Sequence, residues 1–339
     1  METRRPKTEY SLEDNYKSIL NLIGEAERFS IAVHLNPDAD ALGSALALAG
    51  YLINMGKEAN VFIHGLVPPN LRFLPGSDTI ISYTDDCSEL FSGADAIFAL
   101  DLNEPKRLAS LEAAYTTSEA RKVLIDHHLN PSQMSDIIVS ETSATSTGEL
   151  IFKLLERAGV EKFSSATATC LYAAIMADTG GFRFDKTSGD TFRMAAKLTD
   201  CGADPVRIYD EVYNTMSAQA VLLLGITLAS MEIHCDGGLV VMKISDDDFM
   251  RTGASEMDIE NFSDRLLMVS GARMGVLLSE ITERNETRIS FRSKNGISVR
   301  ELAAEFGGGG HRQAAGARMS GEPFPTAVRI VTERAMEYF

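Results

Sequence analysis

The sequence lacks the features that mark secreted and membrane proteins. Its most apolar stretches, 41–53 and 221–231, are shorter than the ~20 residues that a transmembrane helix needs. Residues 1–15 are charged and polar, without the apolar segment of a secretory signal. We therefore expect a globular protein that is located in the cytoplasm and does not interact with membranes.

Cysteine is scarce, and its spacing carries no motif. The four cysteines are scattered, and no pair has the C-x-x-C spacing of zinc sites and redox motifs. Without a secretory signal, a disulfide framework is not expected either. We expect free thiols, buried or half-buried, at Cys87, Cys170, Cys201 and Cys235.

Positive charge is also scarce, because 32 lysines and arginines stand against 48 acidic residues, for a net charge of −16. Proteins that hold long nucleic acids neutralise many phosphates, so this balance argues against a long duplex as a partner. The segment 271–318 is an exception, with seven arginines and one lysine against five glutamates, a net +3. An anionic substrate is therefore expected to be small, or to be bound by a local positive region.

The length of 339 residues and the 45% hydrophobic content predict two domains. Between residues 31 and 139, short apolar runs alternate with helical patterns, which is typical of a parallel sheet covered by helices. The expected strands are 31–34, 59–63, 96–100, 122–125 and 136–139. The segment 201–205 contains glycine and proline and indicates a helix end.

After residue 220, the apolar runs are better paired as antiparallel strands. The predicted fold class is α/β, with an N-terminal parallel-sheet domain and a smaller α/β domain after it. The expected boundaries are 1–200 for the first domain, 201–222 for a linker and 223–339 for the second domain.

The segment His34-Leu35-Asn36-Pro37-Asp38-Ala39-Asp40 follows the first expected strand. Its proline keeps the preceding residue out of the helical conformation. We therefore expect His34, Asp38 and Asp40 on a loop at the carboxyl edge of the sheet, where ligands bind in open α/β folds.

The same placement recurs further along the chain. Asp101 follows the strand 96–100, the triplet Asp126-His127-His128 follows 122–125, and Asp178 ends an apolar stretch. Taken singly, such an aspartate is more often a helix N-cap, and such a histidine is more often packed or solvated. Five carboxylates and three histidines at one edge are better explained together, because the repulsion among the carboxylates is costly without cations.

Imidazole and carboxylate ligands without thiolate favour Mn²⁺, with Co²⁺, Fe²⁺ or Zn²⁺ as substitutes, over an all-oxygen Mg²⁺ or Ca²⁺ site. The ligands suffice for two Mn²⁺ ions, which a carboxylate can bridge at the separation of about 3.5–4 Å found in two-metal hydrolases.

In their order, these blocks resemble the motifs of the DHH phosphoesterases, named for the triplet seen here at 126–128. The first motif matches at 34–44, and the fourth matches as Asp178-Thr179-Gly180-Gly181-Phe182-Arg183. The glycine-rich segment 307–316 is similar to the hallmark of the DHHA1 domain. The pairing resembles the two-domain nano-RNase and pAp-phosphatase subgroup, which implies an active site in a cleft between the domains.

The resemblance also implies roles for individual residues. It implies two metal sites that share Asp101: one with His34 and Asp38, the other with Asp40, His127 and Asp178. Asp126 is expected to orient a ligand imidazole, and His128 is expected to face the substrate phosphate. The roles of Asn103 and Arg107, which follow Asp101, stay open.

A run of four glycines is usually a flexible linker, but this run stands between a helical pattern and a histidine. Glycine amides can form a nest that binds anions and that a side chain would obstruct. We predict that the second domain binds the substrate phosphate through Arg292, Ser293, Gly308, Gly309, Gly310 and His311. Arg292 is equally well explained as an exposed strand-end arginine, and Arg183 as either a substrate contact or a surface ion pair.

The expected reaction is hydrolysis of a phosphate ester by water that the two metal ions activate. By the resemblance, the substrates are short oligoribonucleotides, degraded to nucleoside monophosphates, and the 3′-phosphate of pAp. Two alternatives stay open, namely a phosphodiesterase for dinucleotides such as cyclic di-AMP or pApA, and a nucleotide-binding protein without catalytic activity. The family also suggests a homodimer, while the cleavage polarity is left undecided.

Overall fold

The computed structural model describes residues 11–259, 262–294 and 296–339, and the chain divides into two compact units, Met1–Thr215 and Met216–Phe339. The boundary falls inside the segment 201–222 that was expected to link the domains. This segment is largely helical, because it contains α8 (Pro205–Tyr213) and the first residues of α9 (Ala218–Ala229).

The first unit is built on a six-stranded sheet in the order β3-β2-β1-β4-β5-β6, in which all neighbours are parallel. This arrangement confirms the predicted parallel α/β domain, and the five expected strands correspond to β1, β2, β4, β5 and β6. The strands are β1 (Arg28–Val33), β2 (Glu58–Ile63), β3 (Ile81–Ser82), β4 (Ala96–Leu100), β5 (Arg121–Asp126) and β6 (Ile137–Ser140).

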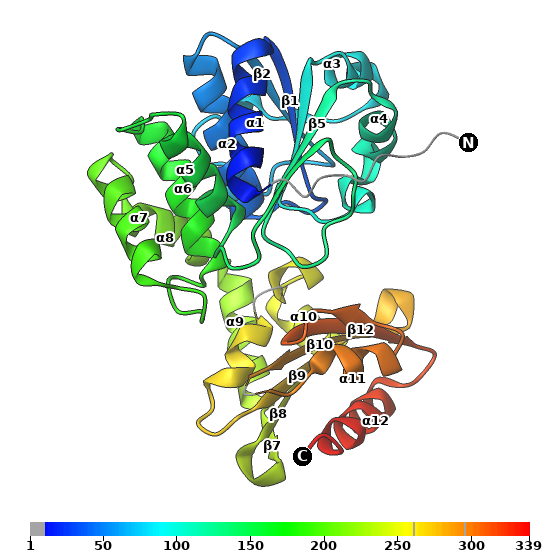
Figure 1. The fold of residues 1–339 in the computed structure, drawn as a ribbon. Coiled ribbons are helices and arrows are strands. Elements are labelled where there is room, and N and C mark those ends of the chain that lie inside the picture. The colour runs from blue at the N-terminus through cyan, green and yellow to red at the C-terminus, as the bar shows by residue number, and fades with distance from the viewer. Residues whose placement is uncertain (1–10, 260–261, 295) are drawn as a thin grey trace. The chain divides into compact units, whose positions relative to one another are not determined.

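Both faces of this sheet are covered, which explains why its strands are continuous apolar runs rather than alternating ones. One face packs against α3 (Ser88–Ser92), the 3₁₀ segment η4 (Pro105–Leu111) and α4 (Glu112–Thr117). The other face forms the larger core with α1, α2, α5, α6 and α7 (Figure 1). These helices are α1 (Leu12–Glu25), α2 (Ala39–Asn54), α5 (Thr147–Arg157), α6 (Ser165–Asp178) and α7 (Gly189–Asp200).

Helix α2 lies at the centre of the first unit. Its sequence ADALGSALALAGYLIN is apolar on nearly every side, and twelve of its sixteen residues are buried, as expected for a helix enclosed by protein. Gly43 lets it approach α6 closely, because an added Cβ would lie 3.1 Å from the Cβ of Ala174. This contact places the first turn of α2 beside the C-terminal half of α6.

The second unit holds a mixed sheet in the order β11-β12-β10-β9-β8-β7, in which β8 and β9 are parallel and the other neighbours are antiparallel. This confirms a second α/β domain. Its strands are β7 (Glu232–His234), β8 (Leu239–Ile244), β9 (Met274–Ile281), β10 (Glu286–Ser293), β11 (Gly309–Gly310) and β12 (Ala314–Ser320).

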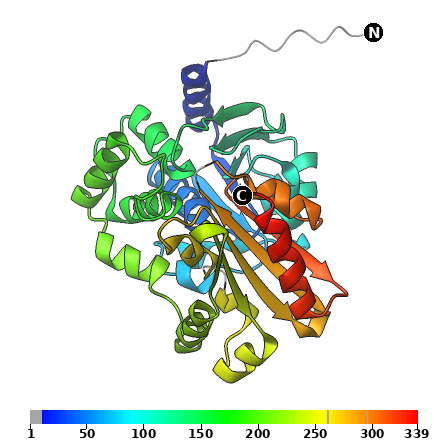
Figure 2. The ribbon, with the colours of Figure 1, turned by 90° about the horizontal axis from the view of Figure 1, so that it is seen from below.

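Helices α11 (Val299–Glu305) and α12 (Phe324–Met336) pack on one face of this sheet, and Figure 2 shows α12 running along it. The other face packs against the 3₁₀ segment η7 (Phe262–Met268), α9 and α10 (Asp246–Thr252). Among the described residues, no single helix is long and apolar enough to cross a membrane. The bent pair α8 and α9 meets that test only when the two are taken together.

Candidate metal centre

The strand order of the first unit determines where its acidic residues meet. After β1 the chain enters α2 on one face of the sheet, and after β4 it enters η4 on the other face. The carboxyl ends of β1 and β4 therefore flank a topological switch point, where open α/β sheets bind their ligands. The loops after β1, β4 and β5 carry the residues singled out in the sequence.

The loop after β1 contains His34 and Asp38. His34 is buried, and its Nδ1 donates to the carbonyl oxygen of Leu35 at 2.7 Å. Asp38 is the N-cap of α2, because its Oδ1 accepts from the amides of Asp40 and Ala41 at 3.0 Å. Its Oδ2 lies 3.9 Å from Nε2 of His34, so the capping role and a role in the site coexist in one carboxylate.

Asp101 lies directly after β4 and is 2% exposed. Its φ of +61° is a left-handed conformation that few residues other than glycine adopt. Its Oδ2 lies 3.2 Å from Nε2 of His34, and its Oδ1 lies 3.6 Å from Nε2 of His127. Burial by itself would raise the pKa of Asp101, but the hydrogen bond with His34 and the nearby imidazoles lower the pKa well below its usual range.

Asp40 is fully buried in the first turn of α2, where the N-terminus of α5 surrounds its carboxylate. The amide of Thr147 donates to Oδ2 at 2.7 Å, and the amide of Gly148 donates to Oδ1 at 2.8 Å. Burial, followed by the negative charges of Asp101 and Asp178, raises the pKa of Asp40 well above its ordinary value. The cluster therefore has an unmet demand for positive charge.

His127 joins Asp40, Asp101 and Asp178. Its Nε2 lies 3.8 Å from Oδ2 of Asp40 and 3.1 Å from Oδ2 of Asp178. Asp178 is the last residue of α6, so that the helix packed against α2 contributes a carboxylate to the group that contains Asp40. Burial lowers the pKa of His127, but the hydrogen bond and charge of Asp178 outweigh this effect and raise it.

These side chains form groups whose ligand atoms lie within 4.8 Å of one another and could hold a metal ion. The groups are His34 with Asp38 and Asp101, Asp40 with His127 and Asp178, and Asp101 with His127 and His128. In a neutral His34 whose Nδ1 carries the proton, Nε2 is an acceptor, and it faces carboxylate oxygens that are also acceptors. Either a second proton on the ring, as in the hydrogen bond with Asp101 described above, or a cation between Nε2 and the carboxylates resolves this conflict. Ligand atoms around one ion bound at about 2.1 Å are about 3 Å apart, and the observed separations of 3.1–3.9 Å are close to this value.

The triplet after β5 shows which imidazole Asp126 contacts. Asp126, which is fully buried, accepts from Nδ1 of His128 at 2.7 Å. The sequence had suggested that Asp126 orients a metal-ligand imidazole, and the imidazole it contacts is that of His128, which was expected to face the substrate and which also belongs to one of the groups that could hold a metal ion. The carbonyl of Leu35, rather than a carboxylate, fixes His34.

Asn103 and Arg107, whose roles were left open, make structural contacts. The side-chain amide of Asn103 donates to the carbonyl of Leu129 at 2.9 Å. The carbonyl of Arg107 accepts from the amide of Leu35 at 2.7 Å. Both contacts connect the loop after β4 to the loops that carry His34 and the triplet.

Arg183 is an exposed residue on the loop after α6, and its Nε donates to the carbonyl of Gly180 at 2.7 Å. Asp178 precedes this loop, whose residues Gly180, Gly181 and Phe182 all have positive φ. The guanidinium of Arg183 thus braces the loop, and within the described part of the chain it forms no ion pair with a carboxylate.

The residues predicted to bind phosphate cluster at one end of the second sheet. Arg292 is half-buried near the end of β10, and its guanidinium donates to the carbonyl of Phe291 at 3.2 Å. The hydroxyl of Ser293 donates to the carbonyl of Ile297 at 2.7 Å, so it holds the following turn. His311 is exposed, and its amide donates to the carbonyl of Ala314 at 2.7 Å.

The glycine run has a structural explanation of its own. Gly309 and Gly310 form β11, which pairs with β12, and an added Cβ at Gly308 would lie 2.7 Å from Cα of Ala317. Gly310 has a φ of +140° and would bring a Cβ within 2.7 Å of Cα of Ala315. At Gly309, in contrast, an added Cβ meets nothing within 4 Å.

Three residues of the site were not found from the sequence. They donate hydrogen bonds to the central carboxylates: Ser44 to Asp40 at 3.3 Å, Gly148 to Asp40, and Thr147 to both Asp40 and Asp101. The segment Ser146-Thr147-Gly148-Glu149 predicts a helix start, but nothing in its spacing indicates a partner more than a hundred positions away.

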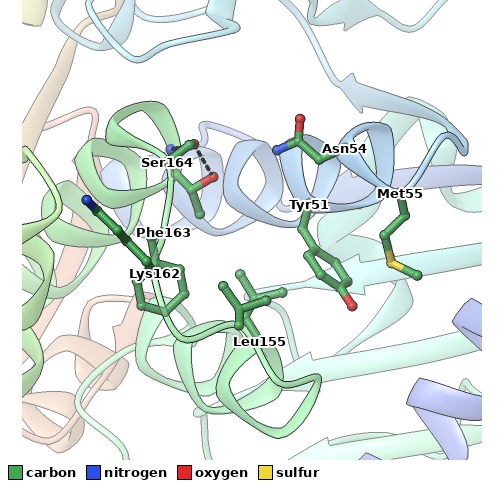
Figure 3. Close-up of a pocket in the computed structure, with 9 residues that line it drawn as sticks. Tyr51, Asn54, Met55, Leu155, Lys162, Phe163 and Ser164 are labelled. Atoms are coloured by element: carbon green, nitrogen blue, oxygen red, sulfur yellow. Dashed lines mark hydrogen bonds between the residues drawn. The ribbon is translucent and has the colours of Figure 1, made fainter.

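A hollow of about 280 Å³ lies elsewhere in the first unit, where Tyr51, Leu155 and Phe163 surround it (Figure 3). It borders Asn54 at the C-terminal end of α2, whereas Asp40 is at the N-terminal end. At 1.5 Å per helical residue, the two places are about 20 Å apart. The hollow is therefore separate from the carboxylate cluster.

Comparison with known proteins finds a family model for each of the two units. The model of the DHH family, N-terminal domain, matches residues 28–175, and that of the DHHA1 domain matches residues 236–337. The chain is 32% identical to the bifunctional oligoribonuclease and PAP phosphatase NrnA of Thermus thermophilus, over 91% of this chain and 89% of the relative. It is 30% identical to the protein of the same name from Bacillus subtilis, over 84% and 87%.

A solved structure extends the match to the whole fold. The crystal structure of an exopolyphosphatase-related protein from Bacteroides fragilis superposes with a TM-score of 0.91 at 31% identity, covering 97% of both chains. The residues of the acidic cluster from His34 to His128 lie within the DHH match, Asp178 lies three residues beyond its end, and the glycine run lies within the DHHA1 match. The chain belongs to the DHH family, and it carries a DHHA1 domain after its DHH domain.

Proposed function

We propose that this protein is a metal-dependent phosphoesterase that hydrolyses short oligoribonucleotides to nucleoside monophosphates and removes the 3′-phosphate of pAp. The observation that carries the proposal is the convergence of four carboxylates and two imidazoles into two metal-binding groups at the edge of the first sheet. The bifunctional relatives, which match over most of this chain and of their own length, support the choice of substrates.

We propose that one divalent ion is bound by His34, Asp38 and Asp101, and a second by Asp40, His127 and Asp178 together with Asp101. The ligands combine imidazole and carboxylate without thiolate, a set that suits Mn²⁺. Two such ions activate water as a nucleophile and neutralise charge that develops on the phosphoryl oxygens. The protein holds these ligands in place and thereby determines where the substrate phosphate can bind.

His128 is proposed to contact the phosphate through Nε2. The carboxylate of Asp126 can only accept a hydrogen bond, so Nδ1 of His128 carries a proton and the ring is fixed by that contact. His128 is also less buried than His127, since their side chains are 19% and 9% exposed. A ring that is fixed on one side and partly accessible on the other is suited to orient a phosphate or to protonate a leaving group.

The second unit is proposed to recognise a further substrate phosphate through Arg292, His311 and the backbone of the glycine run. The local net charge of +3 in 271–318 supports this role within a chain of net charge −16. Arg183, on the loop after Asp178, is proposed as an additional substrate contact. The overall acidity of the protein limits its attraction for long nucleic acids and favours short substrates.

The test is a substrate panel in Mn²⁺ with the wild-type protein and the variants H127A and D101A. The panel contains pApA, RNAs of increasing length, pAp, cyclic di-AMP and pyrophosphate. We expect turnover of short RNA and pAp, and a loss of at least about a hundredfold in both variants. Matched controls are H64A and D78A, which change exposed residues outside the site.

The outcomes separate the alternatives. Cleavage of cyclic di-AMP in preference to short RNA and pAp would support a dinucleotide phosphodiesterase. Binding of dinucleotide without turnover in Mn²⁺ would support a nucleotide-binding protein. Unchanged activity in H127A and D101A would refute the site, and cleavage of pyrophosphate alone would refute a nucleotide substrate.

A further inference from the structure

Thr147 contacts both of the buried carboxylates at the centre of the site. Its amide donates to Oδ2 of Asp40 at 2.7 Å, and its hydroxyl donates to Oδ1 of Asp101 at 3.0 Å. The residue is fully buried, so water does not compete for either hydrogen bond. Thr147 therefore joins the loop after β4 to the first turn of α2 through the N-terminus of α5.

The position of Thr147 in its helix explains why both donors are available. It is the first residue of α5, and the first amides of a helix have no partner within the helix. The N-cap Ser146 accepts from the amide of Glu149, which leaves the amide of Thr147 for Asp40. Inside a helix, a threonine hydroxyl often donates to the carbonyl one turn earlier. Thr147 has no helical turn before it, so its hydroxyl is available to Asp101.

The two carboxylates depend on the Thr147 side chain to different degrees. Asp40 also accepts from the amide of Gly148 and the hydroxyl of Ser44, and its contact with Thr147 uses the backbone. Asp101 receives the side-chain hydroxyl. Replacing only the side chain should therefore disturb Asp101 and leave the hydrogen bonds of Asp40 intact.

We propose that Thr147 is a positioning residue that fixes the rotation of the Asp101 carboxylate, so that one oxygen faces the group that contains His34 and the other faces the group that contains His127, each of which would hold an ion. Oδ2 points toward His34 at 3.2 Å, while Oδ1 points toward His127 at 3.6 Å. The terminal torsion of aspartate is soft, and without the hydroxyl the carboxylate rotates more freely. The proposal rests on the proposed two-metal site.

The test measures metal binding rather than catalysis. Mn²⁺ is titrated into metal-free protein, and free Mn²⁺ is followed by its electron paramagnetic resonance signal. We expect the wild type to bind two ions and to give the signal of a spin-coupled pair. T147V, which removes the hydroxyl at nearly constant volume, should bind Mn²⁺ about 10- to 100-fold more weakly and lose the coupling.

Two further variants separate positioning from packing. T147S keeps the hydroxyl and should restore both affinity and coupling. T227V removes another fully buried hydroxyl, which donates to the carbonyl of Leu223 at 2.8 Å in the second unit, and should leave Mn²⁺ binding unchanged. Circular dichroism of the metal-free proteins checks folding, and T147A replaces T147V if the valine variant does not fold.

Each outcome has a distinct meaning. If T147V or T147A binds two coupled Mn²⁺ ions with wild-type affinity, the positioning role of Thr147 is wrong while the metal site stands. If T147S binds as weakly as T147V, the methyl group and its packing are responsible, and the proposal is again overturned. If the wild type does not bind two ions, the proposed metal site itself fails.

Discussion

Gly43→Ala should destabilise the first unit although alanine is the better helix former. In an open helix, this change stabilises by about 1 kcal/mol. Here the added Cβ would lie 3.1 Å from the Cβ of Ala174 and 3.3 Å from the carbonyl carbon of Cys170, with the carbonyl oxygen nearer still. Two of these three atoms belong to the backbone of Cys170 and cannot rotate away from the added Cβ. The helices α2 and α6 must therefore separate by about 1 Å to regain normal contact distances.

The net effect follows from two opposed terms. Overpacking of a tight interface costs about 3 kcal/mol at the upper end of its usual range, and helix propensity returns about 1 kcal/mol. The expected loss is about 2 kcal/mol, which corresponds to a midpoint lower by about 4–8 °C in a domain of this size. Because α2 carries Asp40 and α6 ends at Asp178, the same separation should weaken Mn²⁺ binding.

Gly50→Ala is the matched control, since it lies in the same helix and faces the same neighbour. Its added Cβ would lie 3.8 Å from Oγ1 of Thr167, an ordinary contact. This variant should be as stable as the wild type or more stable by up to about 1 kcal/mol. Thermal and urea unfolding of the metal-free proteins, followed by circular dichroism, gives both values. If G43A is as stable as G50A, close approach of α2 and α6 is not what requires the glycine.

Three further predictions concern charge, the glycine run and metal. Burial would raise the pKa of Glu149, but the hydrogen bonds from Lys153 and Thr145 together hold it below its usual value. The ionised Glu149 therefore stabilises the folded protein above its unfolded pKa, and this contribution is lost as pH falls through its folded pKa. Below neutral pH, the urea midpoint of E149Q should therefore change less with pH than that of the wild type. The same pH dependence in both proteins would contradict this prediction. G308A should lower the thermal midpoint by separating β11 from β12, whereas G309A should preserve the midpoint and weaken binding of pAp, as measured by calorimetry; equal stability of the two would contradict the packing argument. Removing Mn²⁺ with a chelator should lower the thermal midpoint, since an ion at a hundredfold excess over its dissociation constant stabilises by about 2.7 kcal/mol; a midpoint that Mn²⁺ does not restore would argue against specific binding.

The sheet and the meeting of its acidic residues could be predicted because they depend on local patterns. Continuous apolar runs determine the strands, and a polar residue directly after such a run lies at the carboxyl edge of a parallel sheet. Asp101 follows β4 and is close to His34 for this reason alone. No tertiary information was needed to predict that these side chains lie near one another.

The hydrogen bonds that support the site could not be predicted in this way. Thr147 and Asp40 are 107 positions apart, and only the packing of α5 against α2 brings them together. The imidazole that Asp126 contacts, that of His128, could not be predicted either, because a sequence triplet does not show which neighbouring imidazole a carboxylate reaches. The glycine run illustrates a third limit, since glycine permits both an anion nest and close strand packing.

The segment around Pro205 shows how one signal can have two meanings. Glycine and proline indicated a helix end, and α7 does end at Asp200. Asp204 also caps α8, accepting from the amides of Val206 and Arg207, with Pro205 in the first helical position. The same residues thus end one helix and begin the next, and the expected linker is helical.

The proposed ligands lie far apart in the chain, and this distance has a consequence for synthesis. A chain made from its N-terminus exposes His34 first and Asp178 last, and domains generally fold as units as they emerge. Until α6 is complete, Asp40 lacks the aspartate that shares its metal group. The proposed second ion would then be captured only by a nearly finished domain. Uptake of that ion would therefore report that the last helix of the cluster has docked, and a truncation before Asp178 should remove the group that contains Asp40 while leaving the group of His34, Asp38 and Asp101.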